Sequence, residues 1–341
     1  MVRLVFLADS HLGFDYPVRP RIKRRRRGDD FFANFERVLL YAKKSKADLV
    51  IHGGDFFFRA KVPPKIVEKA YRILLDFADS GIPFVITPGN HERSRLPMVE
   101  KLQHSNIHIF TRPDTFLFDV GGVKIAISGF PFERRFIRDQ FKGILKLTRW
   151  KIQSAQIRLL LMHQAVEGAT VGASNFTFRG SDDVVCLQDI PPQFSAVLCG
   201  HIHRRQILIA PEPGSVPVIF PGSIERTSFA EREENKGFFE LNFARNVGIG
   251  KSNLKKLFLR LPSRPMIDIE IDSHTDQNRV KSMILSRISE ISADAVVRFN
   301  LSDGGETPLK KFINSRFLRE ILPESMNFQF GRNFIDYQDR R

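Results

Sequence analysis

The 341-residue sequence is poor in cysteine, with only Cys186 and Cys199, and in acidic residues. Two cysteines in apolar surroundings exclude a disulfide framework and predict a reduced, cytoplasmic protein. No run approaches the roughly 18 apolar residues of a membrane span, and the apolar start Val2–Ala8 is too short for a signal peptide. The 38 acidic residues face 53 lysines and arginines, a net charge of +15. This excess predicts a polyanionic partner, nucleic acid first and an anionic membrane surface second.

The first 200 residues alternate short apolar runs with amphipathic stretches. The runs lack strict alternation, which is typical of strands buried on both faces. One helix is predicted after Asp30 as its N-cap, and another from Pro64 to a stop signal at Gly81. Strands alternating with helices predict an α/β fold. The strands are expected at Val2–Ala8, Asp48–Ile51, Phe84–Thr87, Val123–Ser128, Arg158–Met162 and Ala196–Cys199.

The pattern changes after His203, where strands follow one another with turn residues between them. Pro262–Pro265 is predicted to be a domain joint, because two prolines flank a polar pair. Beyond it, a strand and a helix carrying Val280, Ile284, Ile288 and Ile291 predict a small α+β domain. The expected organisation is therefore a main domain over 1–261, a linker over 262–265, a small domain over 266–330 and a tail over 331–341. The later strands are expected at Val218–Phe220, Gly237–Phe243, Leu254–Leu261 and Met266–Ile271.

Five short polar motifs stand where apolar strands end. Because ligands bind beyond the carboxyl ends of strands in α/β sheets, these motifs are expected to converge in one crevice. Glu92 apart, they offer two carboxylates, one amide and five imidazoles, a set that suits manganese, iron or zinc and lacks the thiolates of a structural zinc site. Eight potential ligands exceed the needs of one ion, so a two-metal hydrolytic site is predicted. The motifs are Asp9-Ser10-His11, Gly54-Asp55, Gly89-Asn90-His91-Glu92, His163 and Gly200-His201-Ile202-His203.

The spacing within the motifs gives two further expectations. On an extended segment, Asp9 and His11 would point to the same side, as would His201 and His203, because strand side chains repeat every two residues. The glycines at 53, 54, 89 and 200 would let the backbone turn sharply and approach the ions without a Cβ clash.

The ordered series of motifs resembles the calcineurin-like metallophosphoesterases. The resemblance implies a four-layer α/β/β/α sandwich and two divalent ions, with manganese expected and iron or zinc as alternatives. It implies that Asp55 bridges the ions and that a hydroxide between them attacks phosphorus in line. His91 would not be a ligand and would protonate the leaving oxygen. The first ion would be held by Asp9, His11, Asp55 and His203, and the second by Asp55, Asn90, His163 and His201.

Within that superfamily, several segments resemble the SbcD-like double-strand-break repair nucleases. These segments are His163-Gln164, Pro221–Arg226 and Lys236-Gly237-Phe238, and the part after Pro265 resembles the DNA-capping domain of those enzymes. The resemblance implies a DNA exo- or endonuclease that tends to dimerise. Phe58 stands where some members carry a DNA-steering histidine, which weakens the case for duplex exonuclease activity. No long linker with terminal helices follows the small domain, so docking on a coiled-coil ATPase is not predicted.

Arg21–Arg27 holds six basic residues in seven and lies just after the first metal motif. It is predicted to line the mouth of the site and hold nucleic-acid phosphates; the alternative is a solvated arm or pairing with Asp29 and Asp30. His52 is expected in the core, and Phe56–Phe58 to pack under its loop rather than stack on bases. Glu92 would orient His91 or cap a following helix. The basic residues in question are Arg21, Lys23, Arg24, Arg25, Arg26 and Arg27.

These inferences favour a metal-dependent DNA phosphodiesterase that acts in DNA repair, without a membrane partner. Two rivals stay open. A phosphoesterase for a small nucleotide or a lipid-linked phosphate would not need a +15 surface. A non-catalytic DNA-binding subunit would not need the complete ligand set and His91.

Overall fold

The computed structural model describes residues 1–16, 25–211, 214–244, 254–302 and 307–334. They form two compact units. One contains residues 1–16 and 30–262, and the other contains residues 25–29 with residue 263 onward.

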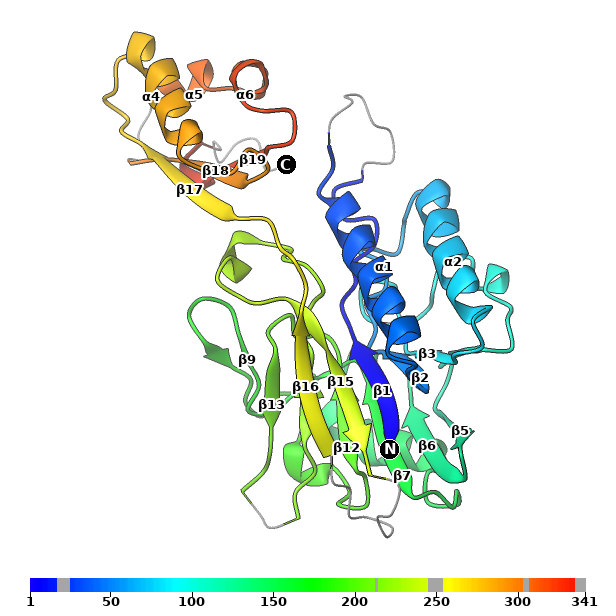
Figure 1. The fold of residues 1–341 in the computed structure, drawn as a ribbon. Coiled ribbons are helices and arrows are strands. Elements are labelled where there is room, and N and C mark those ends of the chain that lie inside the picture. The colour runs from blue at the N-terminus through cyan, green and yellow to red at the C-terminus, as the bar shows by residue number, and fades with distance from the viewer. Residues whose placement is uncertain (17–24, 212–213, 245–253, 303–306, 335–341) are drawn as a thin grey trace. The chain divides into compact units, whose positions relative to one another are not determined.

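The first unit contains two six-stranded sheets (Figure 1). In the first sheet β1 (Val2–Leu7), β2 (Leu49–His52), β3 (Phe84–Ile86) and β4 (Ile107–Ile109) are parallel. Two antiparallel strands, β15 (Gly237–Phe243) and β16 (Leu254–Arg260), extend it beyond β1.

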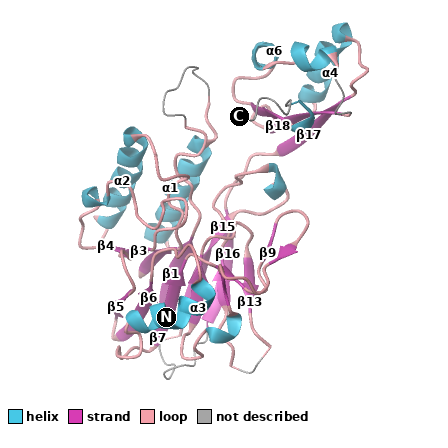
Figure 2. Cartoon of the chain, turned by 180° about the vertical axis from the view of Figure 1, so that it is seen from behind, coloured by secondary structure: helices cyan, strands magenta, loops and turns pink. Residues whose placement is uncertain are grey.

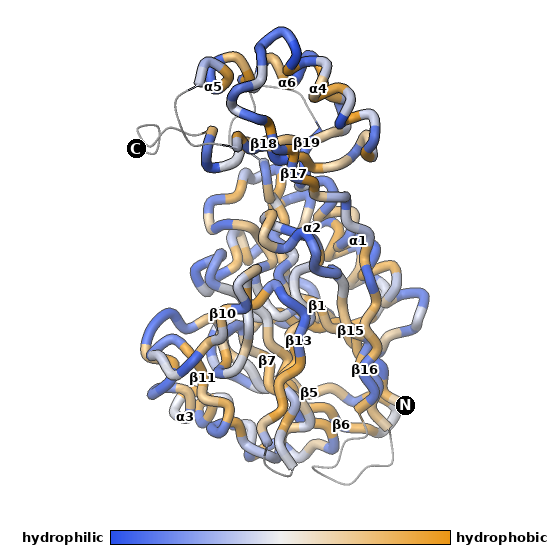
Figure 3. The backbone as a smooth tube through the Cα atoms, turned by 90° about the vertical axis from the view of Figure 1, so that its left-hand side faces the viewer, coloured by the Kyte–Doolittle hydropathy of each residue, from blue (hydrophilic) through white to orange (hydrophobic). Residues whose placement is uncertain are grey.

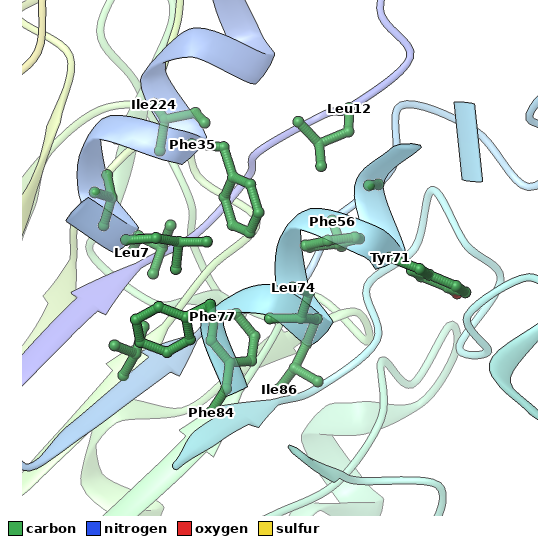
Figure 4. Close-up of a cluster of buried hydrophobic side chains, with 14 of the residues drawn as sticks. Leu7, Leu12, Phe35, Phe56, Tyr71, Leu74, Phe77, Phe84, Ile86 and Ile224 are labelled. Atoms are coloured by element: carbon green, nitrogen blue, oxygen red, sulfur yellow. The ribbon is translucent and has the colours of Figure 1, made fainter. Parts of the chain in front are cut away.

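Helices α1 (Gly28–Lys44) and α2 (Pro64–Ala78) pack on one face of this sheet. The close-up in Figure 4 shows Leu7 of β1 and Phe84 of β3 facing Phe35 of α1 and Phe77 of α2. All four side chains are at most 1% exposed. The stripe of large apolar side chains on each helix is what fixes it to the sheet.

The second sheet has the order β13-β14-β12-β7-β6-β5. Its parallel strands are β6 (Val123–Gly129), β7 (Ile157–Met162), β12 (Ala196–Cys199) and β14 (Val218–Phe220). The antiparallel edges are β5 (Asp114–Val120) and β13 (Gln206–Leu208). Helix α3 (Ile137–Leu147) covers its outer face, which Figure 2 shows from behind.

The two sheets pack against each other. Along β1, Leu4 and Phe6 belong to the cluster between the sheets, while Val5 and Leu7 belong to the cluster under the helices. Figure 3 shows the strands of both sheets largely in orange, the hydrophobic end of the scale. The predicted α/β class, with two sheets between helices and strands buried on both faces, is confirmed.

The second unit has a parallel sheet of β17 (Met266–Ile271), β18 (Val296–Leu301) and β19 (Asn327–Phe330). Helices α4 (Gln277–Ser289), α5 (Pro308–Phe312) and α6 (Ser315–Ile321) supply apolar side chains to its core. Asp276 caps α4 by accepting a hydrogen bond from the backbone N–H of Asn278. The second unit also contains the 3-10 turn η4 (Arg332–Phe334).

The first unit contains further short elements besides its two large sheets. They are β8 (Ala165–Val166), β9 (Thr170–Val171), β10 (Phe176–Thr177), β11 (Val184–Val185) and the 3-10 turns η1 (Val99–Lys101), η2 (Leu187–Asp189) and η3 (Phe229–Glu231).

Two sequence predictions about helix ends are wrong. Helix α1 begins at Gly28, so Asp30 lies in its first turn and is not the N-cap; a carboxylate is favourable there because the first turn carries unpaired N–H groups. Helix α4 ends at Ser289, two residues before Ile291, which still packs against the small core. Among the described residues, no helix is long and apolar enough to cross a membrane.

Candidate metal centre

Polar side chains from both sheets meet where the parallel strands end. Asp9 and His11 follow β1, Asp55 follows β2, and His163 follows β7. These four side chains are at most 1% exposed. Burying two carboxylates without a cation beside them would cost free energy of folding, so this arrangement requires positive charge nearby. The remaining members of the predicted set, Asn90, His91, His201 and His203, follow β3 and β12.

Three overlapping groups of these side chains have ligand atoms within 4.8 Å of one another. The first group is Asp9, His11 and His203. Its two imidazoles face each other, with the Nε2 atoms of His11 and His203 only 2.9 Å apart. The Asp9 Oδ1 atom lies 4.0 Å from Nε2 of His203.

Asp55 belongs to both other groups, one with His11 and His91 and one with Asp9 and His163. Its Oδ2 atom lies 3.4 Å from Nε2 of His163 and 4.0 Å from Nε2 of His11. A carboxylate shared in this way could serve as a ligand common to two cations.

Asn90 connects the remaining two histidines. Its Oδ1 atom lies 3.0 Å from Nε2 of His163 and 2.9 Å from Nδ1 of His201. An amide oxygen beside two imidazoles offers one oxygen and two nitrogen donors, which suits manganese, iron or zinc.

One oxygen in the cluster supports a metal rather than a purely structural network. The buried Oδ2 of Asp9 has no hydrogen-bond partner among the described residues. Buried polar atoms are almost always paired, so an unpaired carboxylate oxygen in a group with two facing imidazoles fits a site for cations.

Burial and neighbouring charges shift the titration of these groups in opposite directions. Burial raises the pKa of Asp9 to about 6 and lowers the pKa of His201 to about 3. Burial would also raise the pKa of Asp55, but the neighbouring histidines, His163 first and then His11 and His91, outweigh it and hold that pKa well below its usual range. Asp55 is therefore the carboxylate most firmly ionised, as a bridging ligand must be.

His91 differs from the other members of the set. Its side chain is 32% exposed, and its Nε2 lies 3.8 Å from Oδ2 of Asp55. Its Nδ1 is hydrogen-bonded to the carbonyl oxygen of Phe58. A carbonyl only accepts, so Nδ1 carries a proton and Nε2 is the atom presented to the site. The backbone N–H of His91 also donates to Oδ1 of Asp55 at 2.9 Å.

The prediction that Asp9 and His11 lie on an extended segment is wrong. Asp9 has φ 52° and His11 φ 43°, both left-handed, and His201 has φ 82°. Such values cost free energy in residues other than glycine and cluster at functional sites. Each of these loops turns sharply because the polypeptide leaves its β-sheet at this point.

The glycines act as expected at Gly54 and Gly89. Gly54 has φ +97°, and a Cβ atom there would lie 2.4 Å from Nδ1 of His163. A Cβ at Gly89 would lie 2.2 Å from Oδ1 of Asp55. Side chains at either position would displace a member of the cluster.

Glu92 has neither of its two predicted roles. Its Oε1 accepts from the backbone N–H of Phe57 at 2.6 Å and its Oε2 from that of Gly89 at 2.8 Å. It therefore ties the Asp55 loop to the Asn90 loop instead of orienting His91 or capping a helix. Burial, and then the nearby charge of Asp55, raises the pKa of Glu92 to about 8.

Sequence reasoning missed the support of His203. Oε1 of Glu231 lies 3.1 Å from Nδ1 of His203, and Oε2 lies 2.6 Å from Nζ of the buried Lys236. Lys236 also donates to the carbonyl oxygen of His203 at 2.9 Å. The segment Lys236-Gly237-Phe238, singled out from the sequence, contains this lysine, but nothing in the segment indicates a contact with His203.

The other residues singled out from the sequence are not members of the candidate ligand groups. His52 is fully buried and bonded to Ser10, and Phe56 and Phe57 are buried in the core under α1 and α2. Phe58 is half-buried, with its ring edge-on to His11 and Phe14. Arg25, Arg26 and Arg27 belong to the second unit, while Arg21, Lys23 and Arg24 lie outside the described residues.

Several known proteins are similar to this chain in sequence. A protein of Aeropyrum pernix described as "DNA double-strand break repair protein Mre11" is 27% identical over 286 residues, which cover 80% of this chain and 64% of that protein. A protein of Haloferax volcanii with the same description is 28% identical over 328 residues, 94% of this chain and 66% of its own length. The chain thus spans slightly less than two thirds of both relatives.

Among solved structures, a hypothetical protein from Thermus thermophilus aligns with a TM-score of 0.48 and 15% identity, over 76% of this chain and 100% of that one. Residues 2–205 match the family described as calcineurin-like phosphoesterase, a span that includes Asp9 and His203. The chain belongs to the calcineurin-like phosphoesterase family.

Proposed function

We propose that the chain is a metal-dependent DNA phosphodiesterase of DNA repair. The observation that carries the proposal is the meeting of eight carboxylate, amide and imidazole side chains, with Asp55 among them. This carboxylate is shared by two of the three ligand groups. Two ions held by one shared carboxylate are the arrangement that metallohydrolases use for phosphoester bonds.

The ligands would divide between two ions as the family resemblance implies. Asp9, His11, Asp55 and His203 would hold one ion, and Asp55, Asn90, His163 and His201 the other, with manganese as the proposed metal. When bound, such ions activate water and neutralise charge on the phosphate.

The chain's own residues position the substrate and supply a proton. Nδ1 of His91 is fixed to the Phe58 carbonyl, so the imidazole presents Nε2 on the accessible side of Asp55. A protonated Nε2 there can pass its proton to the leaving oxygen. The Asp55 oxygen that accepts the His91 backbone N–H keeps the two residues in fixed relation.

DNA is the proposed substrate for two reasons. Both curated relatives are described as DNA double-strand break repair proteins, and the chain carries a net charge of +15. The described end of the basic run is fixed within the second unit, because Asn327 Nδ2 donates to the carbonyl oxygen of Arg25 at 3.1 Å. We therefore propose that Arg21–Arg27 and the small domain over 266–330 act together in holding DNA phosphates. On the family resemblance alone, we also propose that the protein works as a homodimer.

The test is one assay on three substrates: end-labelled duplex, end-labelled single strand and bis-p-nitrophenyl phosphate. Each is incubated with manganese or with a chelator. Asp55→Asn is expected to abolish all manganese-dependent cleavage and to lower the bound manganese from about two ions per chain. The matched control is Asp79→Asn, whose side chain is 74% exposed. Cleavage of the small substrate without cleavage of DNA would overturn the DNA assignment. Full activity in chelator would overturn the metal assignment.

A further inference from the structure

A cavity of about 690 Å³ opens on the first unit beside the C-terminal end of α3. Its lining includes Leu145, Trp150 and Ile152, together with residues just before β12. The volume lies within the range of ligand-binding cavities.

This cavity is separate from the candidate metal centre. Its lining residues 149–152 come before β7, whereas His163 follows that strand. Pro191 and Gln193 come before β12, whereas His201 follows it. The six residues of β7 span about 20 Å. The cavity and the metal centre therefore lie at opposite ends of the same strands.

The surroundings of the cavity expose apolar side chains. Ile152, which lines the cavity, is 76% exposed, and Leu147, which follows the lining residue Lys146 in the sequence, is 66% exposed. Trp150 is only 6% exposed, so its indole forms part of the wall and not an open stacking face. A hollow with aliphatic side chains at its edge is typical of a protein-binding site.

The rim of the cavity carries an excess of positive charge. Lys142 and Lys146 lie one turn apart on α3, and Arg149 and Lys151 follow the helix. Lys142 pairs with Asp189 at 2.7 Å. No carboxylate of the described residues pairs with Lys146, Arg149 or Lys151, although Lys151 Nζ lies 5.5 Å from the Trp150 ring.

We propose that this cavity docks an acidic, amphipathic segment of a partner protein. An apolar side chain of the segment fills the hollow, and its carboxylates pair with Lys146, Arg149 and Lys151. DNA is the less suitable occupant, because the exposed Ile152 side chain of the lining would face phosphates with no polar group to offer. A nucleotide is less suitable too, because the indole wall leaves no free ring face for a base.

The test measures binding of a fluorescein-labelled peptide, Asp-Glu-Leu-Phe-Asp-Asp-Ile-Leu-Glu-Glu, by fluorescence anisotropy. The control peptide has the same sequence with Asn and Gln in place of the acids. The acidic peptide is expected to bind more tightly, with an affinity that falls as salt rises. The double variant Lys146→Glu/Arg149→Glu is expected to weaken binding at least tenfold, because it reverses two of the rim charges.

The matched control is Lys44→Glu/Lys255→Glu, two exposed lysines away from the cavity. Ile152→Ser tests the apolar contact without changing charge and is also expected to weaken binding. The manganese content and the melting temperature of each variant are measured to show that it is folded with its metal centre intact. Equal peptide binding by the rim variant and the control variant would overturn the proposal. So would absence of peptide binding, or a rim variant that lost affinity for duplex DNA alone.

Discussion

Glu231 holds the imidazole of His203 from the side opposite His11. Its Oε1 lies 3.1 Å from Nδ1 of His203, and Nε2 of His203 lies 2.9 Å from Nε2 of His11. The carboxylate can only accept, so His203 donates from Nδ1 and keeps Nε2 available as a ligand atom. Lys236 neutralises the buried Glu231 at 2.6 Å. Metal-binding histidines commonly have such a partner, which fixes both tautomer and orientation.

Replacing Glu231 should therefore weaken metal binding. Glu231→Gln is expected to lower manganese affinity by roughly 10- to 100-fold, the usual effect of removing such a partner. Isothermal titration calorimetry of the chelator-treated protein measures this directly. Glu234→Gln is the matched control, because Glu234 also pairs with Lys236, at 2.9 Å, without bonding His203. Equal losses in both variants would mean that the network acts only on stability.

The variant His91→Asn distinguishes between two roles of His91, proton donor and metal ligand. The variant removes Nε2, the atom presented beside Asp55, and leaves the other members of the set in place. Cleavage of bis-p-nitrophenyl phosphate is expected to slow by roughly 10²- to 10⁴-fold, the usual contribution of a positioned acid. Manganese content should stay near that of the unmodified protein. Loss of one ion together with activity would make His91 a ligand instead.

The fold could be predicted from the sequence wherever burial leaves a continuous apolar run. The bounds of β12, β14, β15 and β17 agree with the predicted ones. The edge strands β4 and β5 and the helix α3 were not predicted, because they carry a weaker signal. β5 is partly exposed along its whole length, and α3 contains Gly143 among its charged residues. Edge strands are not buried on both faces, so they lack the continuous apolar run from which a strand can be predicted.

The candidate site could be predicted only in part, for a similar reason. Its polar residues directly follow apolar strand segments, so they can be recognised as short motifs in the sequence. Glu231 stands 28 residues from His203, and Glu92 bonds the backbone of Phe57, 35 residues away. Contacts of this kind depend on tertiary packing and produce no recognisable spacing pattern in the sequence. The left-handed backbone at Asp9 and His11 was unpredictable because no glycine marks those positions.

His52 should make the metal-free protein less stable in acid. Gly54 N–H donates to its Nδ1, so Nε2–H donates to Ser10 Oγ, and the buried ring is neutral. Burial lowers the pKa of His52 to about 3, from 6.5 when unfolded. The unfolded chain therefore binds a proton first, and stability falls as the pH drops from 6.5 towards 3.

This contribution is testable with His52→Gln, whose amide can still donate to Ser10. Urea unfolding in chelator from pH 6.5 to 4.5 should show a shallower loss of stability in the variant. The difference in slope should approach about 1.4 kcal/mol per pH unit once the unfolded histidine is protonated. His274→Gln, at a side chain 77% exposed, is the control. Parallel curves for His52→Gln and the unmodified protein would show that His52 titrates alike in both states.

The last prediction concerns the basic run. Each phosphate contact releases counterions and contributes about −0.9 to the slope of log affinity against log salt on duplex DNA. If the run contacts DNA, the triple variant Arg24→Gln/Arg25→Gln/Arg26→Gln should reduce that slope by roughly two units. Affinity should fall about equally for unrelated sequences, because backbone contacts do not read bases. Arg27 is left unchanged because it is 8% exposed and its loss would disturb packing.

The matched control removes three exposed lysines of the first unit, as Lys44→Gln/Lys255→Gln/Lys256→Gln. It lowers net charge by the same three units, so a general charge effect would appear equally in both variants. A salt-dependence slope that changes only in the arginine variant would show that Arg21–Arg27 contacts DNA phosphates. Turnover of bis-p-nitrophenyl phosphate should stay the same in both, because neither variant alters Asp55, His91 or another member of the cluster. Equal slopes in the arginine and lysine variants would show that the run is a solvated arm and that DNA is held by other cations of the chain.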